Sequence, residues 1–179
     1  FLAWCKANPD RANYGSPAAG STPHFLGALL SLESGVPMQH VAYRGSVPGV
    51  TDVIGGQIPA MFTPHGDFLA NHRAGKLRIL ATSGKQRSVF VPDIPTFAES
   101  GLADFDINSW VGLVAPVKTP RAIVERLNTE LNAALADPEV RAKLEAAGIA
   151  ATPGTAESLS ATIRKELALY GGSSKWLAS

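Results

Sequence analysis

Apolar runs and helix-like segments alternate along the first 84 residues of the chain. Three apolar runs have the length and composition of buried strands: residues 13–18, 38–43 and 57–62. Segments with helical spacing follow them: residues 20–35, 46–56 and 64–75. This β-α-β-α order predicts an α/β fold in which helices cover a parallel or mixed sheet.

The first helix-like segment, residues 20–35, carries both start and stop signals. Ser21 or Thr22 can cap its N-terminus. Pro23 suits the first helical turn, and Gly35 is expected to end the helix. The sequence therefore predicts a strand-loop-helix unit at this position.

The chain changes in character after Gly84. Residues 85–101 hold two prolines within four positions, which predicts an irregular connection with one short helix. Residues 105–116 form a long apolar run that we expect to be a strand buried on both faces. A boundary between two lobes is expected in this region.

The C-terminal third is predicted to be helical. Its helical segments are residues 119–138, 138–148 and 155–172. Thr119 is expected to cap the first of these helices, with Pro120 in its first position. An apolar stripe recurs there at four-residue spacing: Ile123, Leu127, Leu131 and Leu135.

Composition and charge restrict the classes of partner. The chain has 179 residues, of which 45% are hydrophobic and 17% charged, enough to bury a core in one large domain or two small lobes. The formal net charge of +1 gives no general field for holding nucleic acid or an anionic membrane. The single cysteine, Cys5, excludes an internal disulfide. The four histidines lack the spacing of a zinc site, so we expect no metal and no cofactor.

Three loops at the ends of the predicted strands share one chemistry. They supply the candidate ligand-binding residues Gly20, Ser21, Thr22, Arg44, Gly45, Ser46 and Thr63. Free N–H groups at helix starts favour anions, and a guanidinium adds a charge-assisted hydrogen bond. Because ligands bind beyond the carboxyl ends of parallel strands, these loops predict a carboxylate site. Ordinary helix capping explains any one of the loops equally well.

A hydrolase is an alternative that the residues leave open. Ser16, Ser21 and Ser46 lie near histidines in the sequence. A serine hydrolase of the α/β type would show a Gly-x-Ser-x-Gly turn and an acid that orients the histidine, and the sequence shows neither. The hydrolase therefore stays the weaker alternative to a carboxylate-binding protein.

Several segments together resemble a known family. They include "GSTPH" at residues 20–24, "HVAYRGSVPGVTDVIGGQIPAMF" at residues 40–62 and "VPDIPTFAESGLADFDINSWVGLVAP" at residues 91–116. In order and spacing they resemble the substrate-binding proteins of tripartite tricarboxylate transporters, the Bug or TctC-like family. The resemblance implies a periplasmic binding protein of type II, whose two α/β lobes close on a carboxylated solute for transfer to membrane permease subunits. It implies a periplasmic location and a binding protein rather than an enzyme.

The resemblance also assigns regions of the chain. It implies that residues 10–104 are the second solute-binding lobe, nearly complete, and that residues 105–179 are the C-terminal portion of the first lobe. On this assignment the chain lacks the N-terminal part, so residues 105–179 are expected to form a homo-oligomer or to fold back on residues 10–104. The effector domain of a LysR-type regulator, which shares the two-lobed architecture, is a second alternative.

Overall fold

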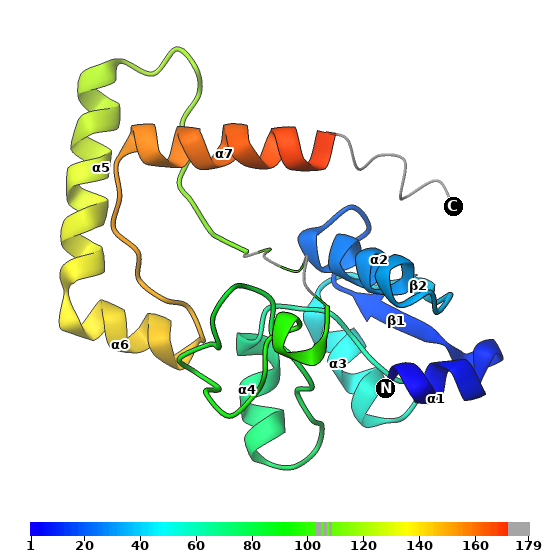
Figure 1. Cartoon of the computed structure of the whole chain (residues 1–179). Helices are drawn as coiled ribbons and strands as arrows, with labels where there is room; N and C mark the ends of the chain where they lie inside the picture. The colour runs from blue at the N-terminus through cyan, green and yellow to red at the C-terminus, as the bar shows by residue number, and fades with distance from the viewer. Residues whose placement is uncertain (103–104, 106, 108, 172–179) are drawn as a thin grey trace. The chain divides into compact units, whose positions relative to one another are not determined.

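The computed structural model describes residues 1–102, 105, 107 and 109–171, and it divides into two compact units, Phe1–Ser109 and Trp110–Ser179 (Figure 1). The first unit contains α1 (Leu2–Ala7), η1 (Pro9–Arg11), β1 (Asn13–Ser16), α2 (Thr22–Ser34), β2 (Gln39–Ala42), α3 (Ser46–Ile54), α4 (Gly66–Arg73) and η2 (Ala98–Ser100). The second unit contains α5 (Arg121–Ala136), α6 (Pro138–Ala146) and α7 (Ala156–Gly171). The alternation of strands and helices confirms the predicted α/β class for the first unit.

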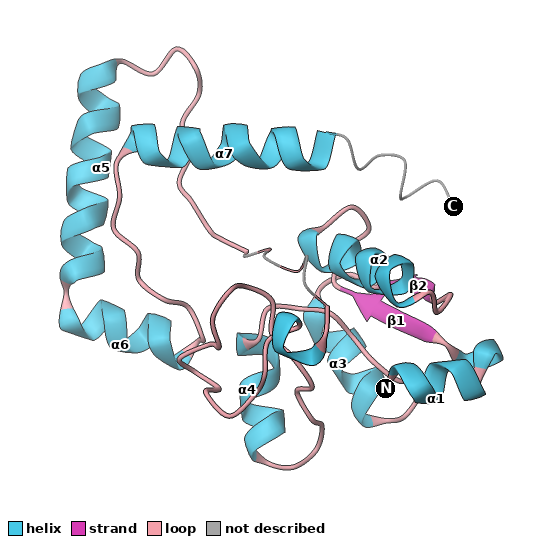
Figure 2. Cartoon of the chain, viewed as in Figure 1, coloured by secondary structure: helices cyan, strands magenta, loops and turns pink. Residues whose placement is uncertain are grey.

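The sheet of the first unit is parallel, as predicted. β1 pairs with β2 (Figure 2), and in this pairing Gly15 lies opposite Val41. On its other side Gly15 forms a parallel bridge with Met61. The prediction of a full strand over residues 57–62 is wrong, because only Met61 joins the ladder and the residues before it turn and bend. β1 is therefore the central element of the sheet.

Alternation along β1 directs consecutive side chains to opposite faces. Tyr14 faces α2, where a Cβ on Gly27 would meet its ring at 2.0 Å. Gly15 faces the other way, toward the side chains of Ile58 and Met61. Met61 and Ile58 pack with Val50 of α3 in a buried cluster. The two helices that start at the carboxyl edge of the sheet thus cover its two faces.

The predicted helix signals of α2 are confirmed. The Ser21 hydroxyl accepts a hydrogen bond from the backbone N–H of His24, with the oxygen and nitrogen 3.4 Å apart. Gly35 ends the helix in the left-handed conformation, at φ 62°. The inner face of α2 buries Leu26, Leu29 and Leu30 against Phe105. Both ends of the helix are fixed by the residues that the sequence offers for that purpose.

The prediction of a buried strand at residues 105–116 is wrong for the part of it that the structure describes. Residues 105, 107 and 109–116 belong to no strand, and residues 106 and 108 lie outside the described part. Val111 is 91% exposed and Val114 is 72% exposed. A strand needs partners for its backbone groups, and none of the described segments offers a ladder here. The apolar composition of residues 105–116 was therefore not enough to predict a strand there.

The helices of the second unit agree with the predicted segments, with one correction. α5 has Pro120 as its N-cap residue, so Thr119 does not cap it. Proline has no hydroxyl, and the first turn is held instead by the Pro120 carbonyl, which accepts the N–H of Ile123. The Asn132 side chain pairs with Gly154 through both the backbone N–H and the carbonyl, at 3.0 and 2.9 Å. This pair fastens the segment between α6 and α7 to α5.

None of the helices in the described residues has both the length and the apolar character needed to cross a bilayer. No group of three or more histidine, cysteine or acidic side chains is placed to hold a metal ion within the same residues.

Candidate functional site

Three loops leave the carboxyl edge of the sheet together. The first loop (residues 17–21) follows β1, the second loop (residues 43–45) follows β2, and the third loop (residues 62–65) follows the bridge at Met61. The N–H of Gly45 donates to the carbonyl of Pro17 at 2.9 Å, which joins the second loop to the first. Gly45 makes this contact at φ 95°, a conformation that favours glycine. The loops therefore form one connected surface.

Side-chain hydroxyls join the second loop to the third. Ser46, the first residue of α3, lies with its Oγ 2.8 Å from Oγ1 of Thr63. Thr63 in turn donates to Oδ2 of Asp67 in the first turn of α4, at 2.6 Å. Two predicted site residues, Ser46 and Thr63, are thus brought into direct contact. Asp67 is a member of the site that sequence reasoning missed, although its position four residues after Thr63 in a helical turn is a usable signal.

Two histidines support the first loop. The N–H of Gly20 donates to Nδ1 of His24 at 3.0 Å, so that ring nitrogen carries no proton. Oγ of Ser16 donates to the carbonyl of Ala18 and lies 2.7 Å from Nε2 of His40. The serine has one proton, so the histidine is the donor in the second contact. His40 and Ser16 thereby hold the end of β1 against β2.

The electrostatic character of this pair follows from burial. Loss of solvent, together with the smaller effect of the neighbouring His24, lowers the pKa of His40 to about 4. Burial also lowers the pKa of His24 below its usual value. Both rings are therefore neutral near pH 7, which agrees with the hydrogen bonds they make.

Most of the hydroxyl protons at the site are already used. Ser21 donates to the carbonyl of Ala18 at 2.7 Å, and Thr63 donates to Asp67. The Gly20 and Gly45 N–H groups are also occupied. The remaining donors are the Thr22 hydroxyl, the exposed Arg44 guanidinium and the backbone N–H groups at the start of α3, which have no intrahelical acceptor. The donors available to an anion are therefore fewer than the sequence suggests.

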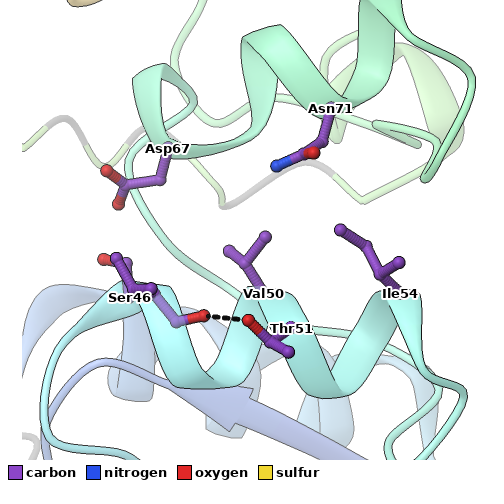
Figure 3. A pocket seen from close by; sticks show the side chains of 7 residues that line it. Ser46, Val50, Thr51, Ile54, Asp67 and Asn71 are labelled. Atoms are coloured by element: carbon purple, nitrogen blue, oxygen red, sulfur yellow. Dashed lines mark hydrogen bonds between the residues drawn. The ribbon is translucent and has the colours of Figure 1, made fainter.

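A groove of about 250 Å³ runs between α3 and α4 beside this surface. Figure 3 shows Ser46 and Asp67 facing each other at one end of it, with Val50, Ile54 and Asn71 farther along. The Thr51 hydroxyl lies along the α3 side and donates to the carbonyl of Val47 at 3.0 Å. The groove thus has a polar end at the loops and an apolar floor.

The contact between Ser16 and His40 does not have the chemistry of a hydrolase nucleophile. Ser16 is completely buried, and its proton is directed to a backbone carbonyl. No carboxylate in the described part of the chain hydrogen-bonds to His40. A serine nucleophile needs access to substrate and a base that accepts its proton, whereas His40 donates here.

Comparison with known proteins decides the family. The sequence profile of the tripartite tricarboxylate transporter family receptor, TctC, matches residues 1–172. The chain belongs to this family. TctC proteins are solute-binding receptors and not enzymes, so the LysR-type and hydrolase alternatives have no support in the comparison.

Individual TctC-type relatives agree with this assignment. The UPF0065 protein in the tcbD-tcbE intergenic region of Pseudomonas sp. (strain P51) is 36% identical over 167 residues, 93% of this chain. BugT of Bordetella pertussis is 32% identical over 172 residues, 96% of this chain. A Rhodopseudomonas palustris structure with adipate has 27% identity, a TM-score of 0.88 and coverage of 99% of this chain. MatC of Rhodopseudomonas palustris with bound malate has 26% identity, a TM-score of 0.81 and the same coverage.

These likenesses confirm the predicted fold class, that of TctC-type periplasmic binding proteins. The chain spans 50% of the Pseudomonas relative and 53% of BugT. It spans 59% of the adipate-bound protein and 60% of MatC. The match therefore covers nearly all of this chain and between 50% and 60% of each of these relatives.

Proposed function

We propose that this chain is part of an extracytoplasmic solute-binding protein that captures a small carboxylate for a tripartite tricarboxylate-type transporter. One observation carries the proposal. Three hydrogen-bonded loops and the N-terminus of α3 meet at the carboxyl edge of a parallel sheet, where this architecture places ligands. Relatives solved with adipate and with malate support a carboxylate as the solute class.

The proposed binding residues have three roles: they supply positive charge, donate hydrogen bonds, and fix the conformation of the loops. Arg44 supplies the positive charge, and Thr22 supplies a hydroxyl donor. The backbone at Ser46 supplies N–H donors in the favourable field of the helix dipole. Gly20, Ser21, Gly45 and Thr63 hold the loops in the conformation that presents these groups.

The remaining parts of the proposal concern the whole receptor. Residues 10–104 form its second lobe, and residues 105–179 form the returning portion of its first lobe. The receptor works in the periplasm, delivers its solute to membrane permease subunits, and uses neither a metal nor a cofactor. The resemblance of the chain to TctC receptors supports the lobes, the location and the permease partners. The spacing of the histidines supports the expectation that no metal is used.

A thermal-shift screen of the chain against dicarboxylates and tricarboxylates tests the binding proposal. We expect a saturable rise in melting temperature for at least one of them. Arg44→Ala should lower the affinity for that ligand by about threefold to tenfold, since an exposed charge-assisted hydrogen bond contributes on the order of 1 kcal/mol. Arg78→Ala is the matched control, because it removes another exposed positive charge from a segment outside the three loops.

The two arginine variants separate a local site from a general charge effect. An equal loss of affinity in Arg44→Ala and Arg78→Ala would show that ligand binding depends on the net charge of the chain and not on a contact with Arg44. Failure of every carboxylate to stabilise the wild-type chain at millimolar concentration would contradict the proposal for this chain.

A further inference from the structure

The hydrogen bonds from Ser46 through Thr63 to Asp67 have a fixed direction. An ionised carboxylate only accepts hydrogen bonds, so Thr63 must donate its single hydroxyl proton to Oδ2 of Asp67, 2.6 Å away. Thr63 then has no proton for Ser46. The contact of 2.8 Å between the two hydroxyl oxygens therefore requires Ser46 to donate to Thr63. Asp67 sets the direction of both bonds.

This direction determines what Ser46 offers to a ligand. Its hydroxyl proton points to Thr63, so its oxygen presents only lone pairs at the mouth of the site. A carboxylate oxygen placed beside it would face another hydrogen-bond acceptor, and the two oxygens could form no hydrogen bond. The backbone N–H groups of Ser46 and Val47 lie in the first turn of α3, where helix geometry leaves them without intrahelical acceptors. The helix start thus offers an acceptor next to donors.

We propose that Asp67, acting through Thr63, makes the site selective for carboxylates that carry a hydroxyl or ammonium group beside the carboxyl group. The carboxylate binds the N–H donors of α3, and the adjacent hydroxyl or ammonium donates to Oγ of Ser46. This inference rests on the proposed function and adds the substrate class. Asp67 is a positioning residue, since it acts through Thr63 and Ser46.

Malate and succinate test the selectivity, because they differ by one hydroxyl group. Titration calorimetry on the full chain should give malate an affinity about fivefold to tenfold higher than that of succinate, as expected for one additional hydrogen bond. Asp67→Asn replaces the carboxylate, which only accepts, with an amide that can either donate to Thr63 or accept from it. The direction of both bonds is then no longer fixed, and the Ser46 proton can turn away from Thr63. The malate preference should then fall to about twofold or less.

Two further variants separate hydrogen-bond direction from charge. Thr63→Val frees the Ser46 proton while Asp67 keeps its charge, so the malate preference should fall as it does in Asp67→Asn. Asp10→Asn removes one exposed negative charge before β1, at the opposite end of the strand, and should leave the preference unchanged. Equal affinities for malate and succinate in the wild type, or an unchanged preference in both Asp67→Asn and Thr63→Val, would overturn the inference.

Neutron diffraction of the deuterium-exchanged chain tests the inference without a ligand. We expect the Thr63 deuteron on the line to Asp67 and the Ser46 deuteron on the line to Thr63. A Ser46 deuteron pointing elsewhere overturns the inference even if carboxylates bind. Absence of binding by both acids with the deuterons as expected counts against the proposed function and leaves the hydrogen-bond direction established.

Discussion

The imidazole rings of His24 and His40 stack with their centroids 3.7 Å apart and their planes 16° apart. His24 comes from the first turn of α2 and His40 from β2, so the stack joins a helix to a strand beneath the first loop. Nδ1 of His24 accepts the N–H of Gly20, which ties the stack to the proposed binding surface. Protonation of that nitrogen would remove the acceptor.

The stack predicts a loss of stability in acid. An unfolded histidine titrates near pH 6.5, whereas burial lowers the pKa of His40 to about 4 in the folded chain. The unfolded state therefore binds more protons between these values, and the free energy of unfolding should fall as the pH drops from about 6.5 to about 4. Urea unfolding monitored across this pH range measures the effect.

His40→Gln keeps a donor for Ser16 and removes the titration, so its unfolding free energy should depend less on pH over the same range. His72→Gln is the control, because His72 lies outside the stack and accepts only a weak bond from the N–H of Ile79. Wild-type stability that is flat between pH 6.5 and 4 would contradict the assignment of neutral stacked rings.

Ser21 stabilises the start of α2. Ser21→Ala removes both the acceptor for the His24 N–H and the donor to Ala18, so the free energy of unfolding should fall by about 1 kcal/mol. Thr51→Ala removes an exposed hydroxyl inside α3 and should change it by less than about 0.5 kcal/mol. Equal effects of the two substitutions would mean that the cap contributes no specific stabilisation.

Gly27 is required by the ring of Tyr14. A methyl group at Gly27 would lie 2.0 Å from Cε2 of Tyr14, which is itself only 2% exposed and has no free space to move. Gly27→Ala should lower the free energy of unfolding by about 1–3 kcal/mol through overpacking. Gly55→Ala is the control, since its nearest neighbour would be a backbone oxygen at 3.4 Å and its φ of −77° suits alanine. A neutral Gly27→Ala would show that α2 can shift away from β1.

The apolar run before α5 predicts self-association. Val111, Val114 and Val117 are strongly exposed, and apolar surface of this kind favours burial against another chain. Light scattering should show an apparent mass that rises with concentration. Val114→Lys should reduce the rise, whereas Lys118→Arg, which keeps the charge next to the run, should not. A monomer at all concentrations, with no binding of a hydrophobic dye, would contradict this prediction.

The sequence was sufficient to predict features set by local chemistry. α2 begins after Ser21 and ends at Gly35, as expected. Helix capping and a left-handed glycine at the C-terminus depend only on residues within one turn, so the sequence is enough to predict them. The order of strands and helices likewise predicted that the Gly20, Gly45 and Thr63 loops would leave the same edge of the sheet. These predictions required no knowledge of side-chain contacts.

Features set by distant contacts were not predictable in this way. Ser46 and Thr63 are 17 residues apart, and the sequence does not show that their hydroxyls meet or that Asp67 takes the proton. The stack of His24 on His40 likewise depends on a contact between residues that are far apart in the sequence. The incorrect strand at residues 105–116 shows the converse, because an apolar segment becomes a strand only where another segment can pair with its backbone.

We propose that the helix start at Ser46 and the loops beside it bind a carboxylate. Nitrogen-15 NMR of the chain during titration with malate tests it most directly, because each backbone N–H reports on its own surroundings and weak binding remains visible. We predict that the amide signals of Thr22, Ser46 and Val47 shift most and saturate together, while those of α7 stay in place. Saturable shifts confined to residues outside the three loops, or no shifts at millimolar malate, succinate and citrate, would contradict the claim.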